Sequence, residues 1–317
     1  MTRPRVLITG ANGFVGRAVS DQANARGFAV GAATRLACRF GGGAENVVVG
    51  NIDGDTFWKA ALADCRAVVH AAARVHVMAD TSVHPLDEFR RVNVQGTLNL
   101  AEHAAAAGVR RFVFISSVKV NGEATAPGLP FCADDVPAPL DAYGISKMEA
   151  EQGLREIAAH TSMEVVIIRP PLVYGPGVRA NFAAMMRWLR RGVPLPLGAI
   201  DNRRSLVALD NLVDLILTCL THPAAANQTF LVSDGQDVST TQLLRRMGRA
   251  MQRPARLVPV PAGWLKEAAM LLGKGDMAQR LCGSLQVDIE KTRRLLAWQP
   301  PLTLDQGLRK TVESLDT

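Results

Sequence analysis

A glycine-rich turn near the N-terminus constrains the fold of this chain more than any other feature. Residues 5–9 form a short apolar run, which is typical of a parallel strand buried on both faces. Three glycines spaced three residues apart follow, and then a segment with helical periodicity that continues to about Arg26. Glycines permit the tight turn and let backbone N–H groups approach a pyrophosphate at the positive helix N-terminus. This order predicts a dinucleotide site, with contacts from Gly10, Asn12, Gly13, Phe14, Val15 and Gly16.

The alternation of strands and helices continues over the first 120 residues. We predict further strands at residues 28–34, 46–50, 67–70 and 111–116, and helices at residues 58–62 and 89–107. Such alternation indicates an α/β fold with a doubly wound parallel sheet of the Rossmann type. We expect residues 1–175 to form the dinucleotide-binding domain, with residues 206–232 returning to it. Residues 176–205 and 233–317 are expected to form a smaller substrate-binding lobe, because proline and glycine loosen the rhythm there.

The end of the second predicted strand bears on the choice of dinucleotide. NAD-binding domains of this kind carry an acid there for the adenosine ribose, about 20 residues past the glycines. This chain has Thr34 and Arg35, with Arg39 nearby. Because an arginine binds a 2′-phosphate bidentately, the pattern favours NADP over NAD. The alternative is that Arg35 is solvated or stacks on the adenine, which leaves NAD open.

The ends of the next two strands offer further contacts to a dinucleotide. Ligands of open α/β sheets bind beyond the carboxyl ends of the strands. Asp53 follows the third predicted strand, where a side chain meets the adenine. Ala71, Ala72 and Ala73 follow the fourth strand, and their small size lets a cofactor lie across its end.

Tyr143 and Lys147 are the main candidates for chemistry. They lie four residues apart in a predicted helix, so both side chains share one face. A phenol titrates near ~10, and a nearby ammonium favours the phenolate, which gives a proton-transfer group that works near pH 7. Taken alone, the pair also fits a surface tyrosine and a solvated lysine. Ser116 and Ser117 at the end of the fifth strand complete a Ser–Tyr–Lys set, although each serine by itself is more typical of a helix or turn cap.

Bulk properties exclude several other classes of protein. A net charge of +7 allows nucleic acid, anionic lipid or a phosphorylated small molecule as partner. The basic residues are scattered and lack zinc-finger spacing, so no nucleic-acid partner is expected. Five dispersed cysteines indicate a reducing compartment, and six histidines without ligand spacing predict no metal site.

The chain is expected to be cytoplasmic and to lack a membrane-spanning segment. Its N-terminus runs directly into the first strand, unlike a signal peptide, and no apolar run approaches 18 residues. Residues 185–191 and 264–272 form apolar helices with basic edges. Packing within the lobe is the ordinary explanation for them. The alternative is a weak peripheral contact with a membrane surface, and hence a sugar linked to a lipid diphosphate as substrate.

Together these motifs resemble the extended short-chain dehydrogenase/reductase family over nearly the whole chain. The resemblance is to its nucleotide-sugar branch of 4-epimerases, dehydratases and 4-keto reductases. The matching segments are residues 9–16, 92–97, 116–117, 143–147, 169–177, 204–211 and 296–300.

The resemblance assigns roles to individual residues. It implies that Tyr143 exchanges a proton with the sugar, that Lys147 holds the nicotinamide ribose and lowers the pKa of the tyrosine, and that Ser117 hydrogen-bonds the reacting oxygen. It implies a UDP-sugar substrate and a homodimer built on two Ala-rich helices. The further contacts that it implies are Asn93, Ser116 and Pro170 to the cofactor, and Asn121, Asn181 and Arg204 to the substrate.

Departures from the family pattern narrow the expected reaction. Val118 and Lys119 replace the acid pair of the 4,6-dehydratases, so water elimination is not expected. The Thr34-Arg35 ending favours a reductase that exchanges NADPH at each turnover. Residues 116–122 are similar to bacterial enzymes that reduce UDP-4-keto-6-deoxy-N-acetylhexosamine to an N-acetylquinovosamine-type sugar for surface polysaccharide. The alternative is a UDP-glucose or UDP-N-acetylglucosamine 4-epimerase. A more remote alternative is a sensor that binds the cofactor but catalyses no reaction.

Overall fold

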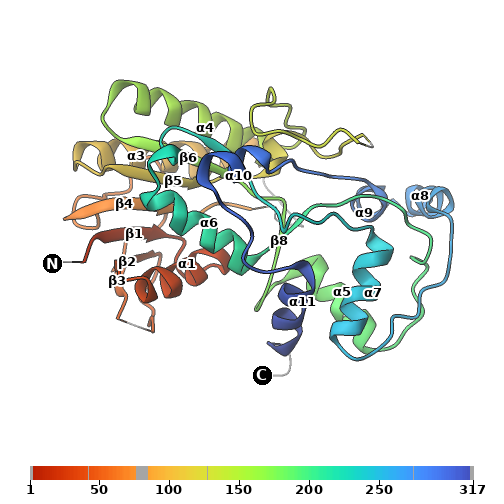
Figure 1. The fold of residues 1–317 in the computed structure, drawn as a ribbon. Helices are drawn as coiled ribbons and strands as arrows, with labels where there is room; N and C mark the ends of the chain where they lie inside the picture. Colours follow the sequence, from red (N-terminus) through yellow and green to blue (C-terminus); the bar gives the residue numbers. More distant parts are fainter. Residues whose placement is uncertain (1–2, 42, 76–84, 127, 274, 315–317) are drawn as a thin grey trace.

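A seven-stranded parallel sheet forms the centre of the molecule (Figure 1). The computed structural model describes residues 3–41, 43–75, 85–126, 128–273 and 275–314, without the side chains of residues 180, 181 and 276. The strands are ordered β3-β2-β1-β4-β5-β6-β9, which confirms the predicted doubly wound sheet. They are β1 (Arg5–Thr9), β2 (Ala29–Thr34), β3 (Glu45–Val48), β4 (Cys65–His70), β5 (Arg111–Ile115), β6 (Glu164–Arg169) and β9 (Thr229–Leu231).

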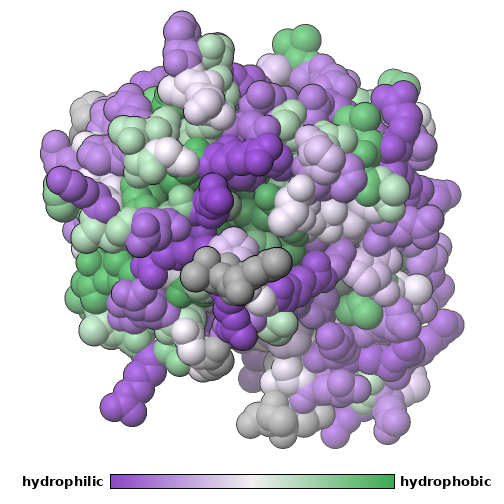
Figure 2. All heavy atoms as spheres, turned by 60° about the vertical axis from the view of Figure 1, so that its left-hand side comes forward, coloured by the Kyte–Doolittle hydropathy of each residue, from purple (hydrophilic) through white to green (hydrophobic). Residues whose placement is uncertain are grey.

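Helices cover both faces of this sheet. α3 (Gly96–Ala106) and α4 (Ala142–His160) pack on one face, and α1 (Phe14–Ala25) and α6 (Leu209–Thr221) pack on the other (Figure 1). The central strands are therefore apolar along most of their length, as a sheet buried on both sides requires. Polar side chains cover most of the outer face seen in Figure 2, with apolar ones between them.

A smaller lobe stands at the end of the molecule away from β1–β3 (Figure 1). It has its own apolar core and a two-stranded sheet. α10 lies beside β9. The elements outside the main sheet are β7 (Leu172–Tyr174), β8 (Leu206–Ala208), α5 (Ala180–Arg190), η3 (Pro223–Ala225), α7 (Thr240–Ala250), α8 (Ala262–Leu271), α9 (Gly275–Cys282), α10 (Glu290–Leu296) and α11 (Leu304–Glu313).

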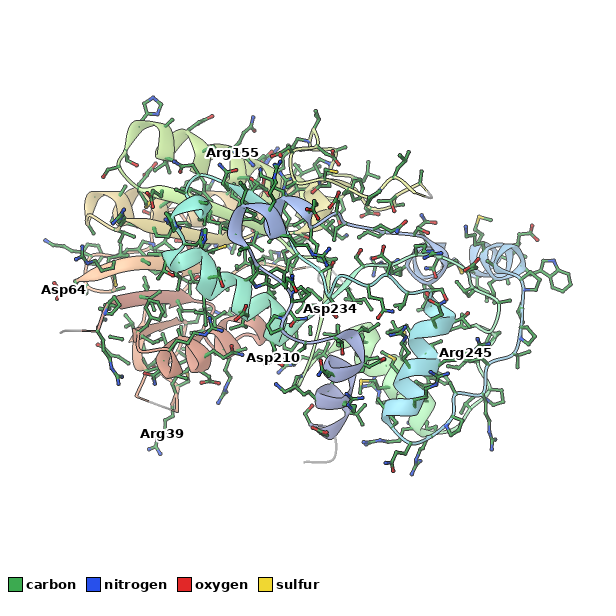
Figure 3. The ribbon with its side chains drawn as sticks, viewed as in Figure 1. Arg39, Asp64, Arg155, Asp210, Asp234 and Arg245 are labelled. Carbon is green, nitrogen blue, oxygen red and sulfur yellow. The ribbon has the colours of Figure 1, made fainter. Side chains whose placement is uncertain are left out.

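A buried polar cluster around Asp234 joins the sheet to the lobe. Asp234, labelled in Figure 3, follows β9 and lies where the two parts meet. Its carboxylate accepts hydrogen bonds from the Tyr174 hydroxyl, the Ala208 N–H and the Asn211 amide, each at 2.7 Å. Because these partners come from β7, β8 and α6, one acid holds three elements together.

Two helix predictions from the sequence were wrong. The single helix expected at residues 89–107 is interrupted: α2 (Pro85–Arg90) leads into a π-helical turn, η1 (Arg91–Gln95), before α3 begins. Such turns frequently occur at functional sites. Residues 58–62 form turns rather than a helix, because so short a segment gains few helical hydrogen bonds for the cost of its first turn, and Asp64 takes a left-handed φ of 58° directly after it.

Candidate active site

The glycine turn between β1 and α1 is shaped by two close approaches. Gly10 has a φ of +63°, and a Cβ on it would lie 2.8 Å from the Ala72 nitrogen. A Cβ on Gly16 would lie 2.2 Å from the Gly10 carbonyl oxygen. The Gly13 N–H closes the turn by donating to that carbonyl at 2.8 Å. The first turn of α1 has no side-chain cap, so its N–H groups remain for an anion. The cradle therefore fits a dinucleotide pyrophosphate.

The segment across the turn is fixed by a short polar chain at the ends of β1 and β4. The Thr9 hydroxyl lies 2.7 Å from His70 Nδ1 and accepts the Ala72 N–H at 3.2 Å. His70 Nε2 lies 3.0 Å from the Thr97 hydroxyl on α3. Burial lowers the pKa of His70 to about 3, so this histidine is neutral and structural. The chain holds the backbone of residues 71–73, with its small half-buried side chains, against the glycine turn.

Asn93, predicted to contact the cofactor, is buried within the π-helical turn. Its carbonyl accepts the Arg74 N–H at 2.8 Å, and its amide donates to the Arg74 carbonyl and to the Ser146 hydroxyl, both at 3.0 Å. The side chain therefore ties η1 to residue 74 and to α4. In this position Asn93 supports the segment beside the cradle.

The first turns of α4 bring the predicted tyrosine and lysine to the carboxyl end of β5. Asp141 caps the helix by accepting the Gly144 N–H at 2.7 Å. Tyr143 hydrogen-bonds Ser117. Lys147 is buried, and its ammonium lies 4.0 Å from the centroid of the Phe114 ring. Two chain segments, the end of β5 and the start of α4, thus assemble the Ser–Tyr–Lys set. The sequence analysis did not find Phe114 as a neighbour of the lysine.

The pKa values of this pair differ from the expectation. Burial, and to a smaller extent the nearby Asp141 carboxylate, raise the pKa of Tyr143 to about 12 against the opposing effect of its hydrogen bond with Ser117. Burial also lowers the pKa of Lys147 to about 7, against the opposing effect of Glu151. The structure therefore does not show the expected lowering of the tyrosine pKa, because desolvation, the largest cause, favours the neutral phenol.

The two serines at the end of β5 point to different partners. The Ser117 hydroxyl accepts the Lys119 N–H at 3.2 Å and caps η2 (Val118–Val120), a single 3-10 turn. The Pro170 carbonyl accepts the Val118 N–H at 3.0 Å and holds the same turn from β6. The Ser116 hydroxyl instead donates to Glu151 at 2.6 Å in the interior. Of the two serines, Ser117 is the one that hydrogen-bonds the phenol of Tyr143.

A buried ion pair lies beneath this site, and the sequence analysis assigned no role to it. Arg169 donates to the two carboxylate oxygens of Glu151 at 2.9 and 2.6 Å, and both side chains are almost fully buried. The spacing of Glu151, four residues after Lys147, is a signal that places it on the same helix face.

Asn121, predicted to contact the substrate, belongs to the same buried network. Its carbonyl accepts Arg169 Nη1 at 3.0 Å, and its amide donates to the Cys132 carbonyl at 2.9 Å. Both polar groups of its side chain therefore have protein partners, and the residue is 3% exposed. The structure places Asn121 in support of η2.

Val118 and Lys119 stand where the 4,6-dehydratases carry their acid pair, and neither is a carboxylic acid. Val118 is buried. The Lys119 ammonium pairs with Asp141 and, at 3.1 Å, with Glu123. A buried valine and a lysine paired with two carboxylates do not offer the acid and base of an elimination.

The remaining residues predicted to contact the substrate or the cofactor are Arg204, Asp53, Arg35 and Asn181. Arg204 donates to the carbonyls of Arg280 and Gly283 at 2.9 and 3.0 Å, and burial lowers its pKa. The Asp53 carboxylate accepts the Asp55 N–H at 3.2 Å within its own turn. Arg35 is exposed beyond β2, on the side where Figure 3 shows Arg39 projecting outward. The side chain of Asn181 lies outside the described residues.

Two other kinds of site are absent from the part of the chain that the structure describes. Within the described ranges, no cluster of histidine, cysteine or acidic side chains is arranged to hold a metal ion. Among the helices of the same ranges, none has the length and apolar character needed to cross a bilayer.

The parallel sheet, the glycine cradle and the Ser–Tyr–Lys set define an NAD(P)-dependent enzyme of the short-chain dehydrogenase/reductase class. Residues 6–233 match the NAD dependent epimerase/dehydratase family, and the chain belongs to that family. The resemblance seen in the sequence is thereby confirmed.

Known relatives extend this likeness over the whole chain. A UDP-glucose 4-epimerase of Vibrio cholerae is 49% identical over 98% of this chain and 94% of its own length. An N-acetyl-alpha-D-glucosaminyl-diphospho-ditrans,octacis-undecaprenol 4-epimerase of Escherichia coli O157:H7 is 28% identical over 97% and 94%. Among solved structures, MoeE5 in complex with UDP-glucose and NAD superposes with a TM-score of 0.78, at 25% identity and 98% coverage of both chains.

Proposed function

We propose that this enzyme interconverts the C4 epimers of a UDP-hexose. The observation that carries the proposal is the hydrogen bond between Ser117 and Tyr143 at the carboxyl end of β5, on the edge of the sheet that also holds the glycine cradle. The 49% identity to a UDP-glucose 4-epimerase supports the choice of reaction and sugar. A sensor without chemistry would need the cradle but not this set of side chains.

The proposed roles follow from the protonation states of the site. The bound dinucleotide would supply the hydride acceptor that oxidises the C4 carbon, and would later return the hydride. With a pKa of about 12, Tyr143 carries its proton at neutral pH and is ready to donate it to a C4 ketone. Ser117 holds the same oxygen. Oxidation of the C4 hydroxyl needs the phenolate of Tyr143, which takes the hydroxyl proton as the hydride leaves C4, and the same proton returns to the ketone when the hydride is given back. The ammonium of Lys147, whose pKa of about 7 leaves it partly charged at neutral pH, favours that phenolate.

A 4-keto reductase was the reading that the sequence favoured, and it remains the alternative. The two reactions share the proton donor and differ in whether the cofactor leaves after one hydride transfer. The proposal turns to the epimerase because the relative named for it is 49% identical over nearly the whole chain.

The test is to incubate the purified protein with UDP-galactose and no added cofactor, and to follow UDP-glucose by NMR. Interconversion without net change in NADH absorbance supports the epimerase. Consumption of NADPH with a UDP-4-keto-6-deoxy sugar, without hexose interconversion, would establish the reductase instead. Tyr143→Phe is expected to lower turnover by on the order of 10²-fold or more while cofactor binding persists.

The identity of the dinucleotide is a separate proposal. We infer that NAD is the cofactor of the epimerase cycle. NADP is the alternative, because Arg35 is exposed at the end of β2, where an arginine can bind a 2′-phosphate. The ratio of the dissociation constants for NAD and NADP, measured by fluorescence titration, decides between them. If the 2′-phosphate is bound, Arg35→Ala weakens NADP by roughly tenfold and leaves NAD unchanged.

We propose UDP as the diphosphate group that carries the sugar. The 28% identical relative supports a lipid diphosphate as the second candidate.

We also propose that the protein forms a homodimer through the outer faces of α3 and α4. A depression of about 640 Å³ lies there and is lined by Leu98, Gly153 and Ile157 among others. Light scattering of wild type and Ile157→Asp tests it: a monomer in both would contradict the dimer.

A further inference from the structure

The helix α8 exposes an unusual amount of apolar surface. None of its ten residues is buried. Large side chains are exposed on the helix, on the turn after it and on α9, by 71% for Trp264, 64% for Met270, 89% for Leu271, 71% for Leu272 and 55% for Met277. We call these five residues the α8 face. Single exposed apolar residues are common on proteins, but a cluster of this kind marks an interaction surface.

The α8 face lies at the end of the lobe that is farthest from the sheet. Figure 1 shows α8 and α9 side by side at this end, with α7 and α5 beneath them. α8 packs chiefly against α9, so its other sides meet no part of the described chain that buries them. The ordinary explanation, packing within the lobe, therefore does not account for this helix.

Positive charge is concentrated in the same lobe. Residues 176–205 and 233–317 contain nineteen basic and ten acidic residues, whereas the rest of the chain contains seventeen and nineteen. Arg245, Arg249 and Arg253 are exposed at four-residue intervals and line one depression of about 410 Å³ that has no acidic side chain. Figure 3 shows Arg245 on α7, at the same end as α8.

We propose that the α8 face docks on the surface of an anionic phospholipid bilayer. Apolar side chains that include a tryptophan, on a lobe that also exposes arginines, are the combination by which peripheral helices bind such surfaces. A second copy of the chain is a poorer occupant, because it would bring another strongly positive lobe into contact. An anionic membrane complements both the apolar residues and the charge.

The lobe that would dock also holds a predicted substrate ligand. Arg204, which the resemblance assigns to the substrate, donates to the Arg280 carbonyl near the end of α9, and α9 packs against α8. Binding of the α8 face to a membrane does not depend on which sugar the enzyme converts.

The test uses the full chain and vesicles of phosphatidylcholine alone or with 30% phosphatidylglycerol. We expect sedimentation with the anionic vesicles, weakened by salt, and little with the neutral ones. Leu271→Ser/Leu272→Ser is expected to weaken the partition at least about tenfold. The control Val136→Ser changes a residue that is 86% exposed elsewhere and should bind like wild type.

Trp264 provides a second readout that a change in folding would not imitate. Trp58 and Trp298 are buried, and Trp188 is 47% exposed, so a Trp188→Phe background leaves Trp264 as the main exposed fluorophore. Its emission is expected to shift to the blue on anionic vesicles, and brominated lipid should quench it.

Three results would contradict docking of the α8 face on a membrane. Failure of the wild type to sediment, or equal binding by the double serine variant, would overturn the proposal. So would a dimer that the double variant dissociates in light scattering without any vesicle binding, because the occupant would then be a second copy. Conversion of the soluble UDP-hexose should be unchanged in the double variant, so a failure of the proposed function would be seen separately.

Discussion

Replacing Glu151 by glutamine should strongly lower the free energy of unfolding, because Glu151 belongs to a buried ion pair. The carboxylate is fully buried, accepts the Ser116 hydroxyl at 2.6 Å, and pairs with Arg169 at 2.6 and 2.9 Å. Glutamine keeps the shape but removes the charge. The Arg169 guanidinium would then remain buried with only neutral partners, chiefly the Asn121 carbonyl at 3.0 Å.

The magnitude follows from the burial of both partners. Removing one member of a buried ion pair costs about 3–5 kcal/mol, because the remaining charge stays desolvated. For 317 residues, an unfolding entropy of roughly 2.1 cal/mol/K per residue amounts to about 0.7 kcal/mol/K. The expected decrease in Tm is therefore about 5–7 °C.

Thermal unfolding by circular dichroism at pH 7.5 measures the effect, and Glu149→Gln is the matched control. Glu149 lies on the same helix and pairs with Arg90 at 2.6 Å, but the arginine is 42% exposed. A solvent-screened pair of this kind contributes little, so the control should stay within about 1 °C of wild type. Equal Tm values for the two variants would refute the argument from burial. A second readout is the pH profile of turnover: because Glu151 raises the pKa of Lys147, the variant should shift the lysine titration to lower pH.

Two further predictions concern His70 and the glycine cradle. The folded-state pKa of His70 is about 3 and its unfolded value is near 6.5, so the unfolded chain binds the extra proton and stability falls as the pH drops from about 6.5 toward 3. His70→Gln should flatten this decline by roughly 4 kcal/mol in urea titrations across that window, and an unchanged slope would contradict the assignment. Gly16→Ala places a methyl group 2.2 Å from the Gly10 oxygen, so the turn must open; NAD affinity in a fluorescence titration should fall on the order of tenfold or more, and wild-type affinity would contradict the proposed cradle.

Local patterns in the chain were sufficient for the sheet and for the helix that carries the tyrosine. The run of residues 5–9 and the glycines after it identify a buried strand and a tight turn through short-range constraints alone. Tyr143 and Lys147 share a face because helical geometry requires it. The helix interruption at η1 was missed because it involves contacts with distant segments, such as those of Asn93 with Arg74 and Ser146. The turns at residues 58–62 were missed because the predicted helix was too short to offset the cost of its first turn.

The sequence alone therefore determined the succession of strands and helices over the first 120 residues, the glycine turn and the shared helix face of Tyr143 and Lys147, because each depends on residues within a few positions of one another. Only the tertiary structure decided the electrostatics of the site. It raised the pKa of Tyr143 and lowered that of Lys147 by burial, and it turned Ser116 and Asn121 toward Glu151 and Arg169. Desolvation and pairing of this kind arise from contacts between residues far apart in the chain, which no local pattern records.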